Sequence, residues 1–143
     1  MRSWIAALLL IAGTGEARAA QADTPFCTTL RRLMAAAGER PAFRSLGRTG
    51  PVRAAGGLGF DFCRVQAGLY GNRLVCNRFA DRHVMGGAPV EARLARCVPE
   101  ALRMSEPEHS RFTRFRLGLL AFHVERHPRF TTFTLFAMPV ERW

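Results

Sequence analysis

Two histidines and a glutamate near the C-terminus are the residues whose types and spacing come closest to a chemical site. His123, Glu125 and His127 are spaced two apart, so in a β-strand they would point to one face. Two imidazoles and a carboxylate form the ligand set of many zinc and non-haem iron sites. The three would, however, span about 13 Å along a strand, too far to share one ion unless the strand bends. Because Phe122 and Val124 fit a core face, we expect the histidines to face solvent. We predict that the protein binds no metal; if it does bind one, these three residues are the candidate ligands.

A second pattern, Asp81-Arg82-His83, places an acid beside a histidine that it could orient as a general base. No nucleophile stands in a recognisable motif, so we expect a loop of mixed charge and predict neither catalytic residues nor a cofactor. The glycine run from Gly56 to Gly59 lacks both the dinucleotide-binding spacing and the lysine of a phosphate-binding loop. We therefore interpret it as an ordinary loop.

The cysteines predict disulfides. The chain has four of them, Cys27, Cys63, Cys76 and Cys97. No C-x-x-C pair is present, which disfavours zinc, c-type haem and thioredoxin-like chemistry. An even number of cysteines in an exported chain indicates a disulfide framework.

The first 19 residues have the features of an export signal. Arg2 precedes an apolar run, Ile5 to Ala12, which is too short to span a bilayer. Ala17-Arg18-Ala19 then supplies the small-x-small pattern of a cleavage site, and Ala20-Gln21-Ala22 repeats it three residues later. We predict a signal peptide at 1–19, a single domain at 20–143, a periplasmic or secreted location, and no transmembrane span.

The mature chain is strongly basic. All 21 Lys and Arg residues of the sequence are arginine, and removing residues 1–19 leaves a net charge of +9. Such a charge favours anionic partners. One group of arginines, interleaved with phenylalanines, follows the second predicted helix; its members are Arg111, Arg114 and Arg116. We predict that these three bind an anionic polymer or a lipid headgroup. Arginines beside aromatic residues also suit single-stranded nucleic acid, but export disfavours that partner.

The elements that must position these residues alternate between helix and strand periodicity. We expect a first helix to begin at Asp23 or Thr24, with Pro25 at its first position and Gly38 at its end. We expect a hairpin over 58–79 with its turn at 68–71, which would set Cys63 opposite Cys76. A second helix begins at Pro89. Two antiparallel helices would then bring Cys27 to Cys97, and we prefer this pairing over the two other connectivities.

The last third predicts further strands. The apolar phase of residues 112–125 shifts at Gly118, which indicates a bulge or bend, or a division of the strand at this glycine. His127-Pro128 indicates a turn. The final strand, 130–138, carries apolar residues on both faces, so we expect it to be central and covered on both sides or to bury one face against a second subunit.

We therefore predict an α+β fold: an antiparallel sheet of about four to five strands, two helices packed on one face, and two disulfides. The favoured function is that of an exported, non-enzymatic binding module for an anionic envelope partner. One alternative is a small metal-dependent or His-based hydrolase. Another is a structural or assembly factor that forms a homodimer through its C-terminal strand.

Overall fold

A computed structural model describes residues 14–47, 50–79, 90–104 and 111–139 of the chain. These residues form one antiparallel sheet of seven strands in the order β1-β2-β3-β7-β6-β5-β4. The strands are β1 (Gly50–Pro51), β2 (Phe62–Gly68), β3 (Gly71–Phe79), β4 (Leu102–Arg103), β5 (Phe112–Leu117), β6 (Leu120–Arg126) and β7 (Phe130–Ala137). The predicted α+β class is confirmed. The sheet exceeds the expected four to five strands because a two-residue strand lies at each edge.

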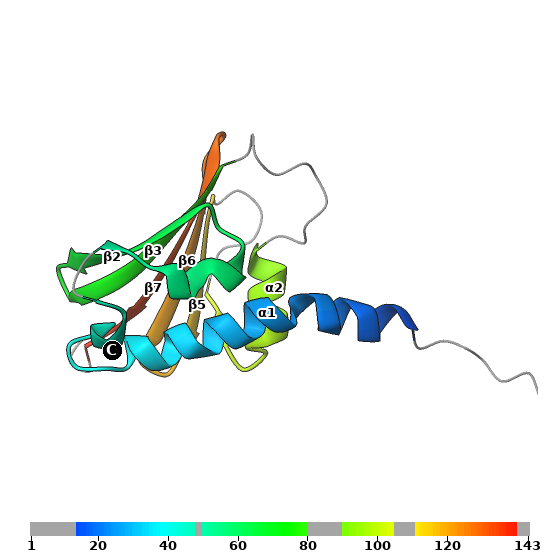
Figure 1. Ribbon diagram of the computed structural model, residues 1–143, viewed down its shortest axis with the longest axis horizontal. Helices are drawn as coiled ribbons and strands as arrows, with labels where there is room; N and C mark the ends of the chain where they lie inside the picture. The colour runs from blue at the N-terminus through cyan, green and yellow to red at the C-terminus, as the bar shows by residue number, and fades with distance from the viewer. Residues whose placement is uncertain (1–13, 48–49, 80–89, 105–110, 140–143) are drawn as a thin grey trace, which may run out of the picture.

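Two α-helices accompany the sheet, α1 (Thr14–Ala37) and α2 (Val90–Cys97), with 3-10 helices η1 (Arg44–Leu46) and η2 (Arg53–Leu58). Figure 1 shows α1 crossing one side of the sheet, with α2 beside it. The core lies between these helices and the sheet. It includes Phe26, Leu30, Leu33, Leu94, Leu74, Phe122, Val124, Phe133 and Leu135. No described element packs on the opposite side of the sheet, which we call the open face.

Helix α1 begins earlier than the sequence predicted. We expected its start at Asp23 or Thr24, but the helix runs from Thr14 through Pro25 without interruption. The physical reason is the alanine-rich composition of residues 14–22, because alanine has the highest helix propensity. Figure 1 shows this first part of α1 projecting beyond the sheet. Among the residues of α1 from Thr24 onward, Phe26 is the first that is buried in the core. Neither described α-helix combines the length and the apolarity needed to cross a membrane.

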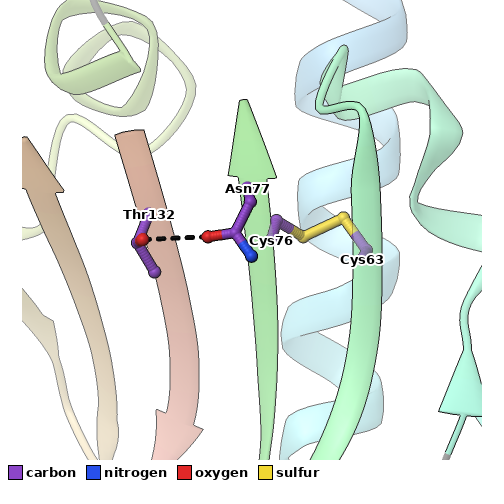
Figure 2. Close-up of a disulfide and its surroundings, with 4 residues drawn as sticks. All are labelled: Cys63, Cys76, Asn77 and Thr132. Carbon is purple, nitrogen blue, oxygen red and sulfur yellow. Dashed lines mark hydrogen bonds between the residues drawn. A yellow bond between two sulfur atoms is a disulfide. The ribbon is translucent and has the colours of Figure 1, made fainter. Parts of the chain in front are cut away.

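Both predicted disulfides are confirmed. Cys27 on α1 is bonded to Cys97 at the end of α2, with 5.1 Å between their Cα atoms. Cys63 and Cys76 are direct partners on β2 and β3, with 4.0 Å between their Cα atoms. Figure 2 shows this bridge linking the two strands. The first bridge joins the two helices, and the second joins the strands of one hairpin.

Two of the hairpin turns differ from the sequence prediction. Pairing of β2 with β3 continues to Gly68 and Gly71, so two residues form the loop where four were expected. At Gly118 the chain makes a hairpin, not a bulge, because Leu117 pairs with Leu120 and Gly118 has a φ of 56°. A turn of two residues and a bulge produce the same shift in apolar phase. The predicted strand over 112–125 is therefore divided at Gly118, which was the alternative left open, into β5 and β6.

The last strand, β7, lies in the centre of the sheet, between β3 and β6. The expectation that it is central is confirmed, but described elements cover one of its faces and not both. Phe133 and Leu135 are buried toward the helices, while Thr132, Thr134 and Phe136 lie half-buried on the open face. Because both edges of β7 are hydrogen-bonded to neighbours, a dimer formed through this strand would have to use its outer face.

The glycine run is not an ordinary loop. Gly56 and Gly57 lie within η2, which packs on α1. A Cβ atom on Gly57 would lie 2.0 Å from Thr29 Oγ1 and 3.0 Å from the carbonyl oxygen of Pro25. Glycine at position 57 thus permits the close approach of η2 to α1. This part of the glycine run therefore packs its backbone against α1.

Candidate anion-binding face

Strand alternation and register arrange the side chains of the open face in rows across the five longer strands. One row, from β2 to β5, contains Arg64, Val75, Thr134, His123 and Arg114. The next contains Gln66, Arg73, Phe136, Ala121 and Arg116. Arginines therefore stand at the β2–β3 side and at the β5 side, and neutral side chains lie between them.

The open face has a large excess of positive charge. Arg64 and Arg73 form one pair on β2 and β3, and Arg114 and Arg116 form a second pair on β5. Strands β7 and β6 separate β3 from β5, which puts the pairs about 14 Å apart at about 4.8 Å per strand. Among the outward positions of the described strands, Glu125 is the one carboxylate. The face is thus cationic at both sides.

The predicted trio of arginines is only partly brought together. Arg114 and Arg116 share the open face, but Arg111 precedes β5 and stands in neither row. The Arg114 guanidinium lies 4.9 Å from the centroid of the Phe112 ring. Arg116 Nε donates to the carbonyl oxygen of Gly118 at 3.4 Å. These contacts orient both guanidinium groups at the surface of β5.

Sequence reasoning missed Arg64 and Arg73. Arg64 donates to the side-chain oxygen of Gln66 when that amide is oriented to receive it. The signal was present in the predicted hairpin, because a register that pairs Cys63 with Cys76 also places Arg64 and Arg73 on the same face. What joined them to Arg114 and Arg116 was the pairing of β3 with β7, which local sequence does not reveal.

His123 lies on the open face, opposite Phe122 and Val124 as expected, but it is half-buried there and not fully exposed to solvent. Its ring makes edge contacts with two phenylalanine rings, Phe112 at 4.9 Å and Phe136 at 4.8 Å between centroids. Burial, which removes water from the charged imidazolium, and the nearby charge of Arg114 together lower the pKa of His123 to about 4. His123 is therefore neutral at neutral pH, with one ring nitrogen able to donate and the other able to accept.

The other two metal candidates, Glu125 and His127, contact each other, and neither shares the ring contacts of His123. His127 Nε2 is 3.2 Å from Glu125 Oε1, and the His127 ring stacks on Phe130 with 4.3 Å between centroids. Within the described part of the chain, no three metal-ligating side chains gather into a group that could hold an ion. The residues Asp81-Arg82-His83 lie outside the described residues.

A hollow of about 380 Å³ opens on the open face beneath the β2–β3 turn. The side chains that line it include Tyr70, Arg73, His123, Glu125, Thr134 and Phe136. Thr132, which also lines it, donates its hydroxyl hydrogen to Asn77 Oδ1 at 2.9 Å, as Figure 2 shows. The hollow therefore combines hydroxyls, a neutral imidazole, aromatic carbon and one charge of each sign.

Comparison with known proteins adds no relative. No protein-family model matches the chain, and neither a curated protein nor a solved structure matches it.

Proposed function

We propose that this protein is an exported, non-enzymatic binding module whose open face binds an anionic polymer of the envelope. The observation that carries the proposal is the pattern of charge on that face: two pairs of arginines, one carboxylate, and no described element covering them. The export pattern of residues 1–19 supports the location. The two disulfides support it too, because such bonds persist in oxidising compartments.

The spacing of the arginines favours a polymer over a single small anion. A guanidinium is always charged and can form two parallel hydrogen bonds with a carboxylate, sulfate or phosphate. Each such contact at a wet surface contributes about 0–1 kcal/mol. A small anion can reach one pair of arginines, whereas a chain of repeated charges can contact both pairs, about 14 Å apart. Once one pair is engaged, the second contact is intramolecular and costs less entropy.

The experiment is heparin-affinity chromatography of the mature protein and two charge-matched variants. One variant replaces Arg64, Arg73, Arg114 and Arg116 by Gln. The control replaces four exposed arginines on the helix side by Gln: Arg31, Arg32, Arg44 and Arg53. Both variants lose the same net charge. We expect the open-face variant to elute at clearly lower salt than the control.

Three results would contradict the proposal. Wild type that flows through at low salt binds no polyanion. Equal elution of the two variants would show that net charge alone is responsible, without a binding face. Binding to vesicles that contain an anionic phospholipid, together with no retention on heparin, would point to a membrane surface instead of a polymer.

A further inference from the structure

The hollow on the open face differs in chemistry from the arginines at its sides. Simple anions require only donors and positive charge, yet this hollow also presents two threonine hydroxyls, a neutral imidazole and a carboxylate. Its volume of about 380 Å³ is within the range of pockets that take small molecules. A ligand that fits it must offer donors, acceptors and apolar surface together.

We infer that the hollow holds one or two sugar rings of an acidic polysaccharide, so that the anionic polymer of the proposed function is a glycan. A sugar ring has hydroxyls that donate and accept, and a face of C–H groups that packs on aromatic carbon. Phe136 and Phe112, which both line the hollow, supply the aromatic carbon. Thr134 and His123, paired directly across β7 and β6, supply groups that can donate and accept.

The hollow is also polarised. Arg73 pairs with Phe136 on β7 and Glu125 pairs with Thr132, so the two charges lie four residues apart along that strand. The offset along the strand direction is about 13 Å at about 3.3 Å per residue, and the two charges stand on β3 and β6, with β7 between them. The acid group of a sugar would lie at the Arg73 end, and a hydroxyl would donate to Glu125 at the other. A ligand that contacts both charges must therefore be longer than one sugar ring.

The state of His123 supports this chemistry. Its pKa of about 4, caused by burial and by the charge of Arg114, keeps it neutral at neutral pH. The two rings that contact its edges, Phe112 and Phe136, limit its rotation. A neutral imidazole in a fixed orientation offers directional hydrogen bonds to hydroxyls. A charged imidazolium would instead attract anions of any kind.

Single-stranded nucleic acid fits the hollow less well. Its negative charges lie on the backbone, and its bases need flat platforms. A phosphodiester crossing the hollow would approach the carboxylate of Glu125, whereas a sugar hydroxyl would donate to it. An acidic glycan can place one charge per unit at Arg73 and direct its hydroxyls elsewhere.

The test is isothermal titration calorimetry with trigalacturonic acid, beside maltotriose, inorganic tripolyphosphate and a thymidylate trinucleotide. Thr134→Val removes the hydroxyl from the hollow and keeps the β-branched shape. The control, Thr131→Val, makes the same change on the same strand at a position of the opposite face. We expect T134V and H123F each to weaken trigalacturonate binding about fivefold, the effect of one lost hydrogen bond, and T131V to change it less than about twofold.

The outcomes separate this inference from the proposed function on which it rests. The sugar site would be overturned if trigalacturonate did not bind, or if T134V and T131V had equal effects. It would also be overturned if tripolyphosphate or the trinucleotide bound as tightly as trigalacturonate. Because T134V changes no charge, its elution from heparin should shift much less than that of the four-arginine variant. Loss of heparin retention in the four-arginine variant, with trigalacturonate binding unaffected by T134V, would keep the binding face and reject the sugar site.

Discussion

Replacing Gly57 by alanine tests the packing of η2 on α1. A Cβ at this position would lie 2.0 Å from Thr29 Oγ1, more than 1 Å inside an ordinary contact of about 3.4 Å. Rotation of Thr29 could move its hydroxyl away. The new atom would still lie 3.1 Å from Thr29 Cβ and 3.0 Å from the Pro25 carbonyl oxygen, so η2 must also shift. We expect a loss of about 1–3 kcal/mol in the free energy of unfolding, typical of overpacking.

The neighbouring glycine is the matched control. A Cβ on Gly56 meets no atom within 4 Å, so G56A should be neutral or stabilise by up to about 1 kcal/mol through the unfolded chain. The assay is urea denaturation of the oxidised protein. Adding T29A to G57A should recover part of the loss, because it removes the nearest atom. Equal stabilities of G57A and G56A would refute the proposed close approach.

Three other predictions concern the disulfides, His123 and the export signal. Removing Cys27–Cys97 with paired alanines should cost about 4 kcal/mol in urea denaturation, against about 3 kcal/mol for Cys63–Cys76, because the bridges close separations of 70 and 13 residues; the reverse order would contradict the chain-entropy explanation. The pKa of His123 in the folded state, about 4, lies below its ordinary 6.5, so the folded state binds fewer protons between these values and stability should fall as pH drops from about 6.5 to 4. Thermal melts should show a smaller fall in H123F, and parallel pH profiles would contradict the burial of His123. Protein exported by a bacterial host should start at Ala20 or Asp23 and take up no alkylating reagent without reductant, as intact mass would show; two or more labelled cysteines would exclude the disulfide framework in the cell.

Sequence patterns predicted the elements whose signals are local. The hairpin register followed from two cysteines equidistant from one turn, and strand pairing placed Cys63 opposite Cys76. The second bridge followed from helix positions, because Cys27 lies near the predicted start of the first helix and Cys97 near the end of the second, and two antiparallel helices bring those ends together. Periodicity and spacing were sufficient to predict these two disulfides because each pairing depends on only two neighbouring elements.

The parts that sequence could not supply depend on pairing between distant strands. The burial of His123 comes from Phe112 and Phe136 on the two neighbouring strands, so its own strand alone predicted exposure. The open face likewise needs β7 to insert between β3 and β6. That order brings Arg73 within three strands of Arg114, although the two residues are far apart in the sequence. The hollow between them is lined by residues from several strands, so no single segment of the sequence predicts it.

The measurement that tests the central claim most directly is a titration of the mature protein with a heparin tetrasaccharide, followed by the NMR signals of the arginine Nε–Hε groups. The account predicts that Arg64, Arg73, Arg114 and Arg116 shift together and saturate at one site, and that the shifts disappear at high salt. Dominant shifts of the helix-side arginines, Arg31, Arg32, Arg44 and Arg53, would contradict the assignment of the open face. So would uniform small shifts over all arginines.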